Sequence, residues 1–139
     1  MEKDFNLERF VQAQAPVYAT VLKELRAGHK RTHWMWFIFP QLKGLGHSEM
    51  AQRYAIRSGD EAAAYLAHPV LGARLRECTT IVDTLDGHTA QEIFGHPDDL
   101  KFRSSMTLFC DVAPDEAMFS DCIDKYFGGD PDDDTLARL

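Results

Sequence analysis

The sequence predicts an all-α fold consisting of a single domain of about seven short helices. Apolar residues recur at intervals of three and four along most of the chain, as on one face of a helix. Residues that start or end helices stand between these segments. No segment alternates apolar and polar residues between turns, as a half-buried strand would. The chain has 139 residues, 45% of them hydrophobic, which is enough for one core.

In the first half of the chain, capping residues mark the expected helices. Asn6 can cap a first helix, and Pro16 suits the first turn of a second helix, which Gly28 ends. Ser58 and Glu61 have the spacing of a capping box, in which each side chain accepts a hydrogen bond from the other residue's backbone amide. This pair therefore predicts the start of another helix.

In the second half, the clearest helix follows Pro69. Its apolar residues form one stripe at intervals of four and three: Leu71, Leu75, Cys78, Val82 and Leu85. Thr89 and Glu92 form a second predicted capping box, and Pro97 and Pro114 each favour a further helix start. We expect the domain to span residues 1–139, with a short N-terminal tail over 1–5 and an acidic C-terminal tail over 130–139.

Composition excludes several classes of protein. Fifteen basic and twenty-two acidic residues give a net charge of −7, which argues against a general nucleic-acid binder. The longest apolar run, residues 34–39, is far shorter than the roughly twenty residues of a membrane span. Three cysteines without a Cys-x-x-Cys pair indicate reduced thiols, as in a cytoplasmic protein. The six histidines lack metal-binding spacing, so we expect neither a metal nor another cofactor.

Residues 31–41 differ from the rest of the chain because they contain both tryptophans. If this segment is helical, it is apolar on all sides, which is typical of a buried central helix. Pro40 would end that helix. The sequence therefore predicts a Trp-rich helix at the centre of the domain.

Several motifs together resemble a known family. They are residues 33–42 (HWMWFIFPQL), 44–46 (GLG), 65–72 (YLAHPVLG), 93–95 (IFG), 101–109 (KFRSSMTLF) and 126–129 (YFGG). The chain resembles the domain-of-unknown-function family numbered 1810, sometimes mislabelled calpastatin-like, from about Leu7 to Leu136. The resemblance implies a multihelical fold with buried central helices. It implies no established activity, so the function must be inferred from the residues.

The candidate site is a cleft where residues 31–41 meet the helix that contains Lys101. Aromatic walls with a few polar groups are typical of small-molecule sites, and cations beside apolar segments need a negative partner. That partner is either an anionic ligand or one of the many carboxylates of this chain. The candidate ligand-binding residues are Arg31, His33, Trp36, Gln41, Lys101, Ser104 and Ser105.

Two further patterns have simpler alternatives. Residues 43–48 form a glycine-containing loop before a helix start, where Lys43 and free amides could hold a phosphate, but a plain turn also explains the glycines. Lys101 and Ser105, four residues apart, could form a Ser–Lys nucleophile. Hydroxyls bonded back to helix carbonyls explain the same serine more simply.

Three hypotheses for the function follow. The favoured one is a small-molecule-binding protein with a cleft for an anionic or nucleotide-like metabolite. The second is an enzyme that acts on such a ligand by acid–base chemistry. The third is a helical protein-interaction module, which would leave an apolar stripe exposed. An anionic small molecule is the expected partner, and neither nucleic acid nor a membrane is expected.

Overall fold

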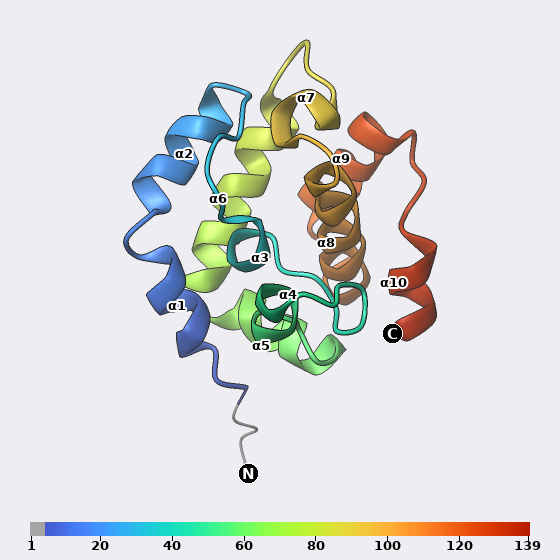
Figure 1. The fold of residues 1–139 in the computed structure, drawn as a ribbon. Helices are drawn as coiled ribbons and strands as arrows, with labels where there is room; N and C mark the ends of the chain where they lie inside the picture. Colours follow the sequence, from blue (N-terminus) through green and yellow to red (C-terminus); the bar gives the residue numbers. More distant parts are fainter. Residues whose placement is uncertain (1–4) are drawn as a thin grey trace.

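The computed structural model describes residues 5–139, which form ten helices and no strand (Figure 1). The helices are α1 (Glu8–Gln14), α2 (Tyr18–Arg26), α3 (Met35–Ile38), α4 (Glu49–Arg53), α5 (Gly59–Ala67), α6 (Leu71–Thr84), α7 (Ala90–Phe94), α8 (Asp98–Val112), α9 (Ala117–Phe127) and α10 (Asp133–Arg138). The all-α prediction is confirmed, although the expected number of helices was too low. None of the helices in this part of the chain is long and apolar enough to cross a membrane.

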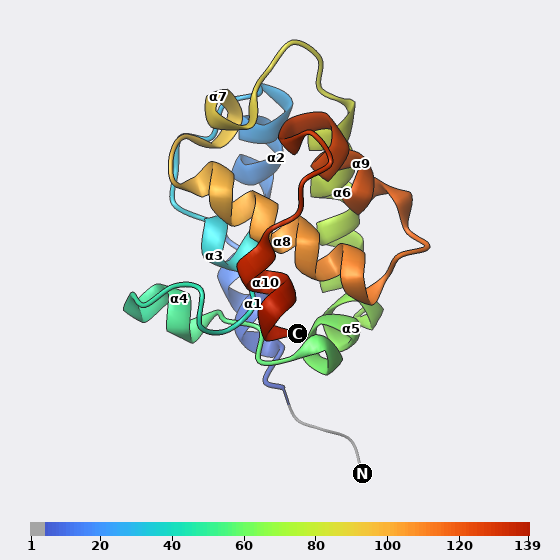
Figure 2. The same cartoon turned by 90° about the vertical axis from the view of Figure 1, so that its right-hand side faces the viewer.

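The central element of the fold is α8, which contacts α3, α5, α7, α9 and α10. Figure 2 shows α8 running across the middle of the molecule with α10 in front of it. Every residue from Ser104 to Phe109 is buried, so this stretch meets protein on all sides. Three of these residues are serine or threonine, whose small side chains let neighbouring helices approach closely.

The Trp-rich segment is not the central helix that the sequence predicted. Only residues 35–38 are helical, which is about one turn. Trp34 is buried, with 1% of its surface exposed, but Trp36 is only partly buried. Arg31, Thr32 and His33 are exposed.

The carboxylate of Glu24 on α2 explains why α3 begins only at Met35 and not at the start of the Trp-rich segment. It accepts hydrogen bonds from the backbone amides of Arg31 (2.8 Å) and Thr32 (3.1 Å), from the Thr32 hydroxyl and from the Trp34 indole. These bonds fix residues 31–34 against α2. Burial raises the pKa of Glu24, but the hydrogen bonds outweigh it and lower the pKa to about 2.

The two predicted capping boxes have different outcomes. The box of Thr89 and Glu92 at the start of α7 is complete. At the start of α5, Ser58 accepts the expected hydrogen bond from the Glu61 amide. The Glu61 carboxylate, however, binds arginine side chains instead of the Ser58 amide. This second box is therefore only half formed.

The C-terminal segment differs from the predicted tail. Residues 130–139 contain α10, which Asp132 caps through the amide of Thr135. The Thr135 side chain is buried, so this segment is packed onto the domain rather than a solvated tail. Of the predicted N-terminal tail, residues 1–4 lie outside the described residues.

A single isolated bridge between Leu42 and Ile56 organises the segment that contains α4. The amide of Lys43 donates to the carbonyl of Ile56 (2.7 Å), and the amide of Ile56 donates to the carbonyl of Gln41 (2.8 Å). These two bonds bring both ends of residues 43–55 together. Lys43 is thereby placed beside the connection between α4 and α5.

Candidate functional site

A cleft of about 570 Å³ lies between the start of α1, the loop over residues 43–47 and the connection from α4 to α5. Helices α1, α4 and α5 lie at the same end of the molecule in Figures 1 and 2. The lining residues are Asn6, Arg9, Lys43, Gly44, Gly46, His47, Gln52, Arg53, Ala55 and Arg57. We call this the basic cleft, because the described lining contains four cationic residues and no carboxylate.

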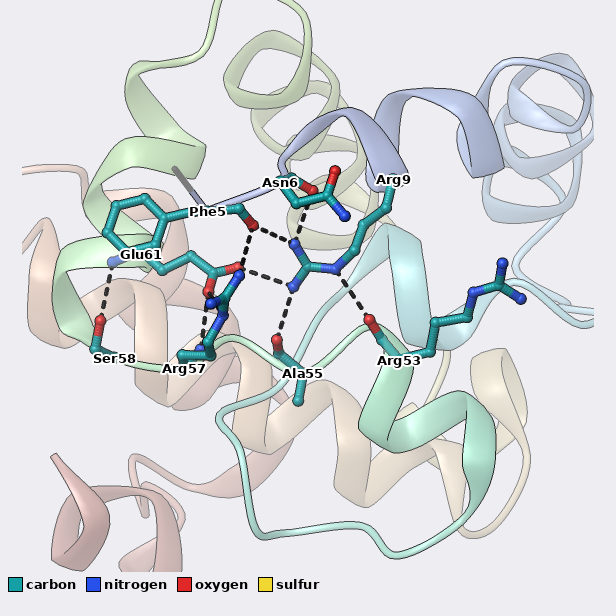
Figure 3. Close-up of polar contacts among 8 residues, drawn as sticks. All are labelled: Phe5, Asn6, Arg9, Arg53, Ala55, Arg57, Ser58 and Glu61. Atoms are coloured by element: carbon teal, nitrogen blue, oxygen red, sulfur yellow. Dashed lines mark hydrogen bonds and ion pairs between the residues drawn. The ribbon is translucent and has the colours of Figure 1, made fainter. Parts of the chain in front are cut away.

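Arg9 holds the walls of the basic cleft together (Figure 3). The guanidinium donates to one carboxylate and to four backbone carbonyls from both sides of the cleft, at distances of 2.6 to 2.9 Å. The acceptors are Glu61 and the carbonyls of Phe5, Asn6, Arg53 and Ala55. These contacts use every nitrogen of the guanidinium. Arg9 is therefore a positioning residue and not a candidate ligand contact.

Glu61 is the negative partner inside this wall. Its side chain is fully buried and lies 2.9 Å from Arg9 Nη2 and 3.3 Å from Arg57 Nε. Its carboxylate also accepts a hydrogen bond from the Arg57 backbone amide at 3.1 Å. The Arg57 side chain stays 54% exposed. Glu61 thus holds both the backbone and the guanidinium of Arg57, whose Nη2 also donates to the Phe5 carbonyl at 3.1 Å, while the side chain remains exposed in the cleft.

Lys43 and Arg53 are the two cationic lining residues whose side-chain charges are not paired within the described residues. Both residues are exposed, and neither side chain forms an ion pair or hydrogen bond within residues 5–139. The Arg53 guanidinium lies 5.8 Å from the Tyr54 ring centroid, and Figure 3 shows it pointing away from the contacts of Arg9. Lys43 and Arg53 therefore present two unpaired positive charges to the cleft, and Arg57 adds an exposed guanidinium that is paired with Glu61.

A second cleft, of about 440 Å³, lies where the Trp-rich segment meets α8. It contains four of the seven predicted site residues: Trp36, Gln41, Lys101 and Ser104. We call it the Trp36 cleft. Its other side chains include Asp132 and Asp134 from the α10 segment.

The remaining three predicted residues lie elsewhere. Arg31 and His33 are exposed and do not line the Trp36 cleft. Ser105 is fully buried, and its hydroxyl has no hydrogen-bond partner. Ser105 is therefore closed off from solvent, which leaves the suggested Ser–Lys pair with Lys101 without an accessible nucleophile.

The ammonium of Lys101 is already paired with a carboxylate, which it shares with Lys30. Its ammonium lies 3.2 Å from Asp98 Oδ1 and 4.7 Å from the centroid of the Trp36 ring. The other Asp98 oxygen pairs with Lys30 at 2.8 Å. Burial raises the pKa of Asp98, but the two ammonium groups outweigh it and the pKa is lowered. With Asp132 and Asp134 also present, the Trp36 cleft is not the cationic site that the sequence predicted.

The residues that make the basic cleft were mostly missed from the sequence. The sequence offers Lys43 as a phosphate contact, but it favours a plain turn as the explanation of the neighbouring glycines. Arg9, Arg53 and Arg57 form no sequence motif, because only the tertiary fold brings them together: the Arg9 guanidinium donates to the Arg53 carbonyl, and Arg9 and Arg57 share the carboxylate of Glu61. The one available signal was local, namely two arginines four residues apart beside the glycine loop.

Other reactive groups offer no competing site in residues 5–139. No group of three histidine, cysteine, aspartate or glutamate side chains in this range is placed to hold a metal ion. The three cysteines are free thiols, and burial raises the pKa of Cys78 to about 12. A raised pKa disfavours the nucleophilic thiolate.

These features define an all-helical domain with a cationic cleft in a chain of net negative charge. The family model "Protein of unknown function (DUF1810)" matches residues 4–139, and the chain belongs to this family. The resemblance noted from the sequence motifs is thereby confirmed.

The chain is also similar to a solved structure, the conserved hypothetical protein Rv1873 from Mycobacterium tuberculosis. The two chains are 56% identical and superpose with a TM-score of 0.96, over 97% of this chain and 96% of the other. A comparison with curated proteins found no match. Neither the family description nor the name of the similar protein gives an activity, so the function is argued from the site.

Proposed function

We propose that this protein binds an anionic small molecule, a phosphate-bearing or nucleotide-like metabolite, in the basic cleft. The main observation is the convergence of Lys43, Arg53 and Arg57 on one cleft whose described lining has no carboxylate. In a chain of net charge −7, random placement would mix acidic residues into such a surface. Guanidinium groups suit phosphate because they can donate two parallel hydrogen bonds.

The rigidity of the cleft supports this proposal. Arg9 and Glu61 link α1, the end of α4 and the start of α5 before any ligand arrives. The isolated bridge at Leu42 and Ile56 holds Lys43 beside the same connection. A preorganised site loses less conformational entropy on binding, which favours affinity for a small ligand.

The other two hypotheses have weaker support. The interaction-module hypothesis requires an apolar stripe along one helix. The exposed large apolar residues in the described chain come from three separate parts of it: Val70, Leu100, and the pair Leu136 and Leu139. For the enzyme hypothesis, His47 lines both clefts as a proton carrier, but the adjacent hydroxyl in the Trp36 cleft, Ser48, is engaged as the N-cap of α4 and accepts a hydrogen bond from the Ala51 amide.

Calorimetric titration with inorganic tripolyphosphate tests the proposal directly. Each charge-assisted hydrogen bond to phosphate is worth about 1.5–3 kcal/mol, so Lys43→Ala and Arg53→Ala should each weaken binding about 10- to 100-fold. Both changes should leave the melting temperature without ligand nearly unchanged, because neither side chain has a polar partner in the described fold.

Arg31→Ala is the matched control, since Arg31 is an exposed arginine outside both clefts. It should bind tripolyphosphate like the unmodified protein. The proposal fails if tripolyphosphate does not bind at millimolar concentration in low salt. It also fails if Arg31→Ala weakens binding as much as Arg53→Ala does.

A further inference from the structure

The basic cleft and the Trp36 cleft are neighbours. Gly46 and His47 line both of them, so the loop over residues 43–48 lies between the two. A small pocket of about 10 Å³ has lining residues next to both clefts, among them Trp36, Gln41, Gly44 and Ala55. The two clefts are therefore adjacent, with Gly46 and His47 between them.

The two clefts have opposite electrostatic character. Lys43, Arg53 and Arg57 make the first cleft positive. In the Trp36 cleft, the ammonium of Lys101 is paired with Asp98, which it shares with Lys30, and the lining itself contains one lysine and two carboxylates, Asp132 and Asp134. A phosphate is attracted to the first cleft and repelled from the second. The part of a ligand that occupies the Trp36 cleft must therefore be uncharged or must donate hydrogen bonds.

Trp36 provides the surface for such a group. The indole is only partly buried and lines the cleft, whereas the Trp34 indole is buried and already donates to Glu24. The Lys101 ammonium lies over one face of the Trp36 ring, 4.7 Å from its centroid, so the inferred stacking uses the opposite face. A tryptophan ring stacks well on a flat heterocycle, and bases of all kinds stack on aromatic side chains.

Asp134 provides the hydrogen-bond acceptor. Asp132 Oδ2 is occupied by the amide and hydroxyl of Thr135 and by the hydroxyl of Ser104. The Asp134 side chain is exposed and has no ion pair or hydrogen bond within the described residues. A free carboxylate accepts hydrogen bonds from sugar hydroxyls or from the amino groups of a base.

From this arrangement we infer that the ligand of the basic cleft is a nucleotide. Its phosphates lie against Lys43, Arg53 and Arg57, and its nucleoside lies in the Trp36 cleft, stacked on Trp36 and bonded to Asp134. This inference rests on the proposed function and extends it from an anion to a ligand with one charged and one planar end.

Tryptophan fluorescence and calorimetry with ATP, GTP, CTP and UTP, each compared with tripolyphosphate, test the inference. At least one nucleotide should bind about tenfold or more tightly than tripolyphosphate. That nucleotide should also quench the fluorescence of Trp36, because Trp34 is only 1% exposed and cannot reach the ligand. Trp36→Leu should reduce nucleotide affinity to that of tripolyphosphate and leave tripolyphosphate affinity unchanged.

Asp134→Asn and Asp133→Asn form a matched pair on α10, since Asp133 is exposed but does not line the Trp36 cleft. Only Asp134→Asn should weaken the binding of the preferred nucleotide, by about fivefold or more. Equal effects of the two variants would contradict the role of Asp134.

The outcomes separate this inference from the proposed function. If tripolyphosphate binds but no nucleotide binds more tightly or quenches fluorescence, the nucleotide inference is wrong and the anion proposal stands. If neither tripolyphosphate nor any nucleotide binds, both are wrong. If Trp36→Leu weakens tripolyphosphate and nucleotide equally, Trp36 does not contact a nucleoside.

Discussion

Replacing Arg9 by alanine should destabilise the protein more than any other single change at the basic cleft. The Arg9 guanidinium has 14% of its surface exposed and pairs with the fully buried carboxylate of Glu61. It also donates to four backbone carbonyls. Without it, Glu61 keeps only Arg57 as a cationic partner, and that side chain is half-exposed.

The expected loss is about 3 kcal/mol of unfolding free energy. Removing one partner of a buried ion pair costs about 3–5 kcal/mol, because the remaining charge is left desolvated. The ion pair of Glu61 with Arg57 offsets about 1 kcal/mol of this loss, since water screens the exposed guanidinium. For a domain of this size, such a loss lowers the melting temperature by about 10 °C.

Urea unfolding followed by circular dichroism measures this loss. Arg53→Ala is the control, because it removes an arginine from the same cleft that has no ion pair in the described fold. It should change the unfolding free energy by no more than about 0.5 kcal/mol. A double variant with Glu61→Gln tests the cause, since neutralising Glu61 should relieve part of the damage done by Arg9→Ala.

Two results would refute this reasoning. One is a loss below about 1 kcal/mol for Arg9→Ala, which would mean that Glu61 is adequately solvated or paired without Arg9. The other is strict additivity of Arg9→Ala and Glu61→Gln, which would mean that the two side chains do not interact energetically.

Two further predictions concern the scaffold. The folded pKa of Glu24, about 2, lies below its ordinary value of 4.5, so its stabilising contribution is complete above about pH 4.5 and is lost as the pH falls toward 2. Glu24→Gln should therefore be about 2 kcal/mol less stable at pH 7 in urea titrations, and the difference should shrink over that pH range. If the difference is the same at pH 7 and pH 2.5, the charge of Glu24 is not its cause. Gly72→Ala would place a Cβ 2.1 Å from the Leu66 carbonyl oxygen and should cost about 3 kcal/mol. Gly59→Ala, whose Cβ meets only Val112 at 3.7 Å, should be neutral or stabilise α5 by up to about 1 kcal/mol; equal thermal shifts for the two variants would contradict the predicted clash.

The sequence predicted those elements whose stability is decided locally. The capping box of Thr89 and Glu92 formed as expected, because both partners lie within one helical turn and nothing competes for them. The box of Ser58 and Glu61 formed only in part, because the fold brings a guanidinium from α1 to the same carboxylate. That competition depends on a contact between residues 52 positions apart in the chain, and no local pattern reveals it.

Of the two clefts, only the Trp36 cleft contains residues of the candidate site proposed from the sequence, and these residues come from two segments, the Trp-rich segment and α8. Trp36, Gln41, Lys101 and Ser104 line one cleft, where the Trp-rich segment meets α8. For Lys101 the structure has the alternative that the sequence left open, a carboxylate of the chain itself as partner, because Asp98 lies one turn before it; which carboxylate pairs with it, and the approach of Asp132 and Asp134, depend on the tertiary fold. The basic cleft was missed because α1 and the connection from α4 to α5 supply its charges separately.

The isolated bridge between Leu42 and Ile56 has a consequence for how this protein could diversify. Two backbone hydrogen bonds join the ends of residues 43–55, so that this segment forms a closed loop. Its exposed side chains, including Lys43, Gln52 and Arg53, do not belong to the hydrophobic core. Backbone bonds do not depend on side-chain identity, so those exposed positions can change while the anchor stays intact. Under the proposed function, the residues that contact the ligand are therefore largely separate from those that stabilise the core, and variation among relatives at these exposed positions is expected to change the ligand preference without a compensating change in the core.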